Sequence, residues 1–203
     1  MQIAVTGASG QAGSRITAEL ARRGHAVTAI ARNPDRIERH ANVTAVKGDV
    51  FDQAGLARLW AGHDAAVSSV HFLASDPDKL IGAARDSRVG RYLVVGGAGS
   101  LEVAPGVRLV TTPGFPPQYK AEAEKGAAFL DLLRLQVDLN WTFLSPSALF
   151  VAGKRTGQFR LGTDQLLTAA DGKSWISFED FAVALADEIE RPAHQKARFT
   201  VGY

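Results

Sequence analysis

The chain contains 203 residues, of which 46% are hydrophobic and 22% charged, and its 23 Lys and Arg residues against 21 Asp and Glu residues give a net charge of +2. This composition is typical of one globular domain that buries its own core, and it carries no dense basic run of the kind that binds nucleic acid. The absence of cysteine excludes disulfides, thiolate nucleophiles and Cys-ligated zinc. The histidines are scattered without a helical His-x-x-x-His pair, so we expect no metal site.

The first five residues, MQIAV, already read as a strand, so we expect no signal peptide. No apolar run approaches the length that crosses a bilayer, so we expect no membrane partner. A cytoplasmic protein is the resulting expectation.

Short apolar segments alternate with amphipathic ones along the first three quarters of the chain. This pattern predicts strands at residues 3–5, 25–31, 43–47, 65–70, 92–95 and 141–144. It predicts a first helix that ends near residue 23 and further helices at residues 34–40, 53–61, 79–87 and 118–135. Such alternation is typical of a parallel sheet with helices on both faces.

The last quarter is less regular. Short strands are predicted near residues 159–161, 166–167, 175–176 and 198–201, and a capping box at 177–180 opens a helix to about residue 190. We therefore predict a Rossmann-like, doubly wound α/β fold in a single domain, 1–203, in which residues from about 145 to 203 complete the substrate pocket.

Residues 101–117 contain four of the chain's eight prolines, together with two glycines. Such a segment cannot be a helix or a central strand. We expect a loop or irregular hairpin beside the carboxyl edge of the sheet, where lids are found.

A glycine-rich turn, Thr6-Gly-Ala-Ser-Gly-Gln-Ala-Gly13, joins the first strand to the first helix. Gly7 allows the tight turn, Gly10 lets a pyrophosphate approach the backbone, and Gly13 lets the helix pack on the strand. A pyrophosphate there would face the N–H groups at the helix start. The alternative is a turn that binds nothing, but the strand before it and the helix after it favour a dinucleotide site.

The second strand ends in Ile30-Ala-Arg32-Asn, without the acidic residue that accepts a hydrogen bond from the ribose of NAD. Arg32 is suited to pair with a 2′-phosphate and to lie against adenine. Unless it is only a solvated surface arginine, NADP(H) is favoured over NAD(H).

Other strand ends carry small or polar residues. Asp49 and the backbone of Val50 can meet the adenine edge, unless this segment is a simple turn. The small residues Ser68, Ser69 and Val70 leave room for the ribose of a cofactor that crosses the strand ends. The glycines at 96, 97 and 99 likewise suit the close approach of a ligand.

Together these features resemble the atypical short-chain dehydrogenase/reductase superfamily, in its NAD(P)H-binding branch with NmrA-like and biliverdin-reductase-B-like members. Similarity covers almost the whole chain. Four later segments are similar to the proteins called NADH-flavin reductases: PQYKAEA at 117–123, LNWTFLSP at 139–146, GKRTGQFR at 153–160 and DGKSWIS at 171–177. The Trp-Thr-Phe-x-Ser-Pro and Arg-Thr-Gly stretches are more specific than the glycine motif.

The resemblance implies roles for individual residues. It places the pyrophosphate against Gly7, Ser9, Gly10, Gln11 and Ala12, and the adenosine phosphate against Arg32. It places adenine beside Asp49 and Val50, the nicotinamide-side ribose beside Ser68, Ser69 and Val70, and the nicotinamide near Ser145 and Pro146.

The sequence departs from the superfamily in its acid-base residues. Members of the superfamily commonly use Tyr-x-x-x-Lys, in which Tyr donates a proton and Lys lowers its pKa. None of the three tyrosines is followed by lysine at that spacing, and Tyr119 has Ala123 there. No catalytic residue is therefore assigned, and Tyr119 is either a pocket residue or a structural one at a helix start.

A missing proton donor favours an acceptor that delocalises incoming charge over a ketone. The leading hypothesis is an NADPH-dependent reductase of a flavin-like or quinone-like small molecule, with FMN, FAD or riboflavin as candidates. The acceptor would lie beside Phe115, Tyr119 and Phe150, although phenylalanines at such places are often core residues. The alternatives are an NADP(H)-sensing regulator like the NmrA type and a biosynthetic carbonyl reductase or epimerase. A homodimer is left open.

Overall fold

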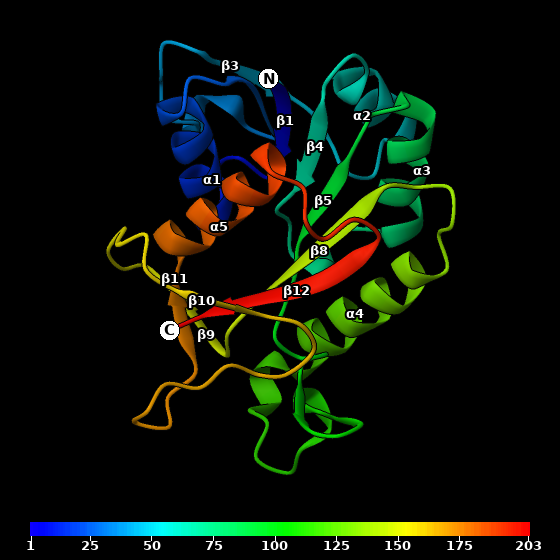
Figure 1. The fold of residues 1–203 in the computed structure, drawn as a ribbon. Coiled ribbons are helices and arrows are strands. Elements are labelled where there is room, and N and C mark those ends of the chain that lie inside the picture. The colour runs from blue at the N-terminus through cyan, green and yellow to red at the C-terminus, as the bar shows by residue number, and fades with distance from the viewer.

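The computed structural model describes residues 1–203 and is built around an eight-stranded sheet (Figure 1). The strand order is β10-β12-β8-β5-β4-β1-β2-β3. All neighbouring strands are parallel except β10, which runs antiparallel to β12 at one edge. The strands are β1 (Gln2–Thr6), β2 (Ala26–Ala31), β3 (Val43–Lys47), β4 (Ala65–Ser68), β5 (Tyr92–Val95), β8 (Trp141–Pro146), β10 (Arg160–Gly162) and β12 (Ala197–Gly202).

Five α-helices cover the two faces of this sheet. Figure 1 shows α1 and α5 together on one side and α2, α3 and α4 on the other. Successive strand residues point to opposite faces, so Ile3 and Val5 enter one buried cluster and Ala4 the other. The helices are α1 (Gln11–Arg22), α2 (Gln53–Trp60), α3 (Pro77–Ser87), α4 (Pro117–Arg134) and α5 (Phe178–Glu190). The predicted Rossmann-like fold is confirmed.

Local capping sets several helix boundaries. The Asp76 carboxylate accepts from the N–H groups of residues 78 and 79, so α3 begins at Pro77 rather than at the predicted residue 79. The predicted helix at 34–40 is wrong: only a 3₁₀ turn, η1 (Pro34–Arg36), forms. The chain becomes extended at Ile37, whose side chain is buried against the core, and it then turns into β3.

Residues 101–117 form the irregular hairpin that the prolines predict, made of β6 (Glu102–Ala104), β7 (Val107–Arg108) and the 3₁₀ turn η3 (Leu109–Thr111). Arg108 holds this hairpin on α4 because its guanidinium donates two 2.8 Å hydrogen bonds to the Asp131 carboxylate. The predicted strand at 166–167 is absent, whereas the unpredicted β9 (Leu149–Val151) pairs with β11 (Trp175–Ser177).

The Arg-Thr-Gly loop after β9 is fastened to α5 and α1. Asp180 accepts hydrogen bonds from the N–H group and hydroxyl of Thr156 at 2.8 and 2.5 Å, and from the Tyr203 hydroxyl at 2.6 Å. Burial opposes ionisation of Asp180, but these hydrogen bonds outweigh it and lower its pKa. Arg155 donates to the buried Glu19 carboxylate at 2.8 Å.

None of the helices combines the length and apolar character needed to cross a membrane.

Candidate functional site

A cavity of about 580 Å³ opens at the carboxyl ends of the central strands. It lies where the strand order reverses, since β2 and β3 extend from one side of β1 and β4 and β5 from the other. In open α/β sheets this switch point is the usual ligand crevice. The lining residues are Thr6, Gly7, Ser9, Gly10, Gln11, Ala12, Ile30, Ala31, Arg32, Gly48, Val50, Ser69, Val70, His71, Phe72, Ala74, Val95, Gly96, Tyr119, Glu122, Phe150 and Phe178.

The glycine turn requires glycine at two of its positions. Gly7 has a φ of +82°, and a Cβ there would lie 2.0 Å from the Ser69 carbonyl oxygen. A Cβ on Gly13 would lie 2.1 Å from the Gly7 carbonyl oxygen. The close approach of backbone to backbone at both positions leaves the space above the turn open.

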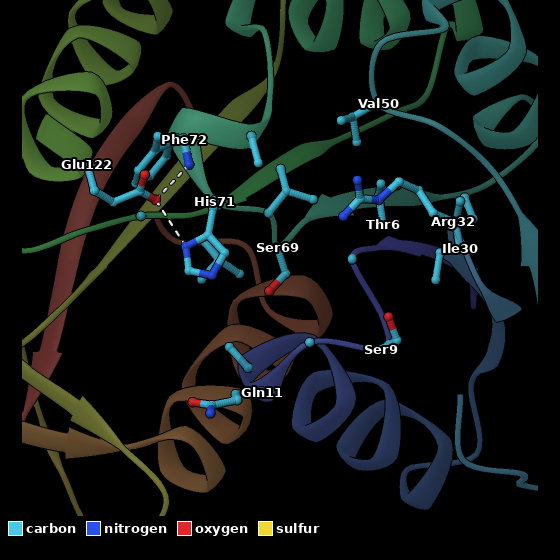
Figure 2. A pocket seen from close by; sticks show the side chains of 18 of the residues that line it. Thr6, Ser9, Gln11, Ile30, Arg32, Val50, Ser69, His71, Phe72 and Glu122 are labelled. Atoms are coloured by element: carbon cyan, nitrogen blue, oxygen red, sulfur yellow. Dashed lines mark hydrogen bonds and ion pairs between the residues drawn. The ribbon is translucent and has the colours of Figure 1, made fainter. Parts of the chain in front are cut away.

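The start of α1 faces this space without a cap. Gly10 occupies the N-cap position, no side chain caps the N–H groups of the first turn, and that turn contains no acidic residue. The unsatisfied N–H groups and the positive end of the helix dipole therefore favour an anion. Figure 2 shows Ser9 and Gln11 at this border of the cavity.

Hydrogen bonds from both neighbouring strands fix the turn. The Gly7 N–H group donates to the Ile30 carbonyl at 2.9 Å, and the Ser69 N–H group donates to the Thr6 carbonyl at 2.8 Å. The buried Trp60 indole donates to the Thr6 hydroxyl at 3.0 Å. The turn is thus attached to β2, β4 and α2 before any ligand arrives.

Arg32 borders the β2–β3 end of the cavity (Figure 2) and makes no ion pair or hydrogen bond through its guanidinium. It also lines an adjoining hollow of about 380 Å³ with Lys47, Gly48, Asp49 and Asp52. Asp49 accepts from the Phe51 N–H group and Asp52 from the Gly55 N–H group, both at 2.9 Å. Each of the two carboxylates thus accepts a hydrogen bond from a backbone N–H group, whereas the Arg32 guanidinium has no partner.

The opposite end of the cavity is formed by β4, β5 and α4. A 3₁₀ turn, η2 (Phe72–Ala74), follows β4 and packs on α4. Glu122 of α4 accepts from the N–H groups of Phe72 at 2.7 Å and Leu73 at 2.9 Å, and lies 3.3 Å from the His71 Nδ1 (Figure 2). A Cβ on Gly96 would lie 2.3 Å from the Phe143 ring, so only glycine fits at the end of β5.

The structure brings most of the expected site residues together. Those that line the cavity are Gly7, Ser9, Gly10, Gln11, Ala12, Arg32, Val50, Ser69, Val70, Tyr119 and Phe150. Expected residues that do not line it are Asp49, which lies in the adjoining hollow, and Ser68, Phe115, Ser145 and Pro146.

Strand geometry accounts for two of these absences. Ser68 is the last residue of β4, and its buried hydroxyl bonds to the Tyr92 hydroxyl at 2.9 Å beneath the cavity. Burial in turn raises the pKa of Tyr92. Ser145 is fully buried within β8, with the Arg198 guanidinium 3.5 Å from its hydroxyl. Ser69 instead lies just beyond the strand and reaches the opening.

Sequence reasoning missed His71, Phe72, Glu122 and Phe178 as cavity residues. The position of His71 just after the Ser-Ser-Val strand end was a usable signal. Nothing local marks Glu122 or Phe178, because their place depends on how α4 and α5 pack on the sheet.

No three His, Asp or Glu side chains gather in a way that could hold a metal ion.

The fold and the glycine-turn crevice define a Rossmann-type dinucleotide-binding protein. The family model described as NAD(P)H-binding matches residues 7–192. The chain therefore belongs to this NAD(P)H-binding family, and the NAD(P)H-binding part of the resemblance is confirmed.

Three solved structures match the whole of this chain. A Burkholderia pseudomallei protein, whose name proposes that it is exported, is 45% identical with a TM-score of 0.90 and is covered over 100% of its length. A Bacteroides thetaiotaomicron protein, named as a proposed epimerase, is 35% identical with a TM-score of 0.95 and 96% covered. SP1627 from Streptococcus pneumoniae, whose name proposes an NADH-flavin reductase, is 38% identical with a TM-score of 0.84 and 99% covered.

Proposed function

We propose that this protein is an NADPH-dependent reductase that passes hydride to a flavin-like or quinone-like acceptor. The observation that carries the proposal is one continuous cavity with three chemically different parts. It runs from the unpaired guanidinium of Arg32, past the uncapped start of α1, to an end that includes the aromatic rings of Phe150 and Phe178.

The first two parts suit a phosphorylated adenine dinucleotide. Arg32 and Lys47 offer cations for a 2′-phosphate, and Gln11 and Ala12 offer backbone N–H groups for the pyrophosphate. Gly7 supports this fit because it lines the cavity and only glycine allows its backbone to pack against Ser69.

The third part suits a planar acceptor. With the adenosine at the β2–β3 end, the nicotinamide would reach the carboxyl ends of β4 and β5, near Ser69 and Gly96. Bound there, the reduced dinucleotide supplies hydride. Tyr119 and Phe150 offer apolar surface against which a conjugated ring can be held beside it.

The names of the related structures support an oxidoreductase in general terms. One proposes an NADH-flavin reductase, and another proposes an epimerase, so the names differ on the reaction. The aromatic surface of Tyr119, Phe150 and Phe178 favours a planar flavin-like or quinone-like acceptor over a simple ketone.

Measured NADPH consumption tests the proposal. Purified protein is mixed with NADPH and, in separate reactions, with FMN, riboflavin, a water-soluble quinone and a simple ketone. We expect consumption with a flavin or the quinone and none with the ketone. Turnover of ketones alone would contradict the acceptor class. Calorimetry with NADPH and NADH measures the affinity for each dinucleotide, and tight binding without any turnover would favour an NADP(H)-sensing protein instead.

A further inference from the structure

Four titratable side chains line the cavity: Arg32, His71, Tyr119 and Glu122. Arg32 lies at the β2–β3 end, whereas the other three gather at the end where hydride transfer is proposed. Of these three, only His71 and Glu122 contact each other. Tyr119 is 62% exposed and its hydroxyl has no hydrogen-bond partner.

Glu122 holds the imidazole through one ring nitrogen and leaves the other free. Its carboxylate is fixed by the N–H groups of Phe72 and Leu73, and its Oε1 lies 3.3 Å from the His71 Nδ1. The His71 side chain is 87% exposed, and its Nε2 has no partner. Figure 2 shows the His71 ring beside Glu122, with the second ring nitrogen turned away from the carboxylate. A carboxylate at Nδ1 keeps the proton on that nitrogen, so Nε2 is the atom that gains and loses a proton.

We infer that His71 is the catalytic acid of the proposed reduction and that Glu122 is its positioning residue. This inference rests on the proposed function and narrows the acceptor. The substrate is a conjugated compound that takes hydride at one atom and a proton at a nearby oxygen or nitrogen, as quinones and flavins do.

The step balances without a further reactant. The acceptor gains hydride as the C4–H bond of the reduced dinucleotide breaks with its electron pair, and negative charge collects on the acceptor's oxygen or nitrogen. His71 then gives that atom the proton on Nε2 and becomes neutral. Because its side chain is exposed, His71 regains a proton from water. One acceptor is reduced by two electrons and one dinucleotide is oxidised.

The surroundings leave His71 as the better donor. Glu122 and Tyr119 are the titratable groups that α4 presents to this end of the cavity, and η2 presents none. Arg15 and Glu179 pair with each other at 3.1 Å, with the guanidinium carbon 5.9 Å from the centre of the Phe178 ring. Tyr119 lacks both an orienting partner and a lysine that would make it a stronger acid.

Kinetics of H71Q, with H40Q as the matched control, test the assignment. His40 lies outside the cavity, and its ring makes no hydrogen bond. With a quinone or flavin acceptor, H71Q is expected to lower kcat by about 10²–10³-fold, with little change in NADPH affinity. The wild-type kcat should fall as pH rises, because the neutral ring has no proton on Nε2, and H71Q should lose this pH dependence. H40Q should match the wild type in every measurement.

The variant E122Q separates positioning from proton donation. The glutamine amide has one acceptor oxygen in place of two, so it cannot accept from Phe72, Leu73 and His71 as the carboxylate does, and the ring is held less firmly. We expect a fall in kcat of about tenfold that keeps the pH dependence, because His71 is still the acid. In the free protein, nitrogen NMR at basic pH should find the proton of His71 on Nδ1. A proton on Nε2 would contradict the role given to Glu122.

The outcomes distinguish the two levels of proposal. If the wild type consumes NADPH and H71Q does so with an unchanged rate and pH profile, the His71 assignment is wrong while the proposed function stands. A loss of NADPH affinity in H71Q as large as its loss of kcat would make His71 a cofactor-binding residue. It would also overturn the assignment. If the wild type reduces no acceptor, the proposed function fails and the inference fails with it.

Discussion

Replacing Arg32 with alanine is the sharpest test of which dinucleotide this protein prefers. The guanidinium borders the cavity and is free of ion pairs, so its removal breaks no interaction within the protein. The free energy of unfolding should therefore stay unchanged, which makes a change in cofactor affinity straightforward to interpret.

The expected magnitude follows from the exposure and surroundings of Arg32. A hydrogen bond between charged groups contributes about 1.5–3 kcal/mol. Arg32 is exposed, and Lys47 lies in the same hollow and can partly replace it, so we expect a loss near or below the lower end of that range. A loss of about 1–2 kcal/mol corresponds to an affinity for NADPH that is about 5–30-fold weaker. NADH lacks the phosphate and loses only the contact with adenine, under about 1 kcal/mol.

Calorimetric titration of R32A with NADPH and NADH measures this difference. R36A is the matched control, because Arg36 is an exposed arginine on η1 that does not line the cavity. The ratio of the two affinities should fall in R32A and stay constant in R36A. An equal loss for both dinucleotides in R32A would refute the assignment of Arg32 to a 2′-phosphate.

Two further substitutions test the turn and the C-terminal loop. G13A forces a Cβ to within 2.1 Å of the Gly7 carbonyl oxygen, so it should destabilise the fold by about 1–3 kcal/mol in thermal unfolding and abolish NADPH binding. G114A meets no atom within 4 Å and should change neither. Because the pKa of Asp180 is lowered by folding, its contribution is complete above about pH 4 and is lost as the pH falls through the folded value. D180N should therefore cost about 1–3 kcal/mol in denaturant unfolding at neutral pH and less in acid, and a constant difference at all pH values would contradict this.

Much of the fold can be predicted from short stretches of sequence. The alternation of apolar strands and amphipathic helices predicts the parallel sheet because each element responds mainly to its own periodicity. The glycine turn is partly local: a Cβ on Gly13 would collide with the Gly7 carbonyl within the same strand-turn-helix unit, whereas the constraint on Gly7 comes from Ser69 beyond β4. The shortened helix at 34–40 is the main failure, because burial of Ile37 opposes a helix that the cap at Asn33 favours.

The candidate site was most predictable where it follows strand ends, although Tyr119 on α4 and Phe150 on β9 were also expected and line the cavity. Gly7, Gly10 and Arg32 lie at the carboxyl ends of β1 and β2, and a strand end carries its position in its own sequence. The choice between Ser68 and Ser69 turns on one residue of strand register, which the tertiary hydrogen bond from Ser69 to Thr6 settles.

The sequence by itself determined the layered α/β order and the glycine turn with Arg32 one strand away, because these depend on backbone geometry and side-chain periodicity over a few residues. Only the tertiary structure decided that Glu122 meets His71 across 51 positions of chain and that Phe178 closes the apolar end. The packing of α4 on one face of the sheet places Glu122, and the packing of α5 on the other face places Phe178. Both depend on the whole core rather than on any local pattern.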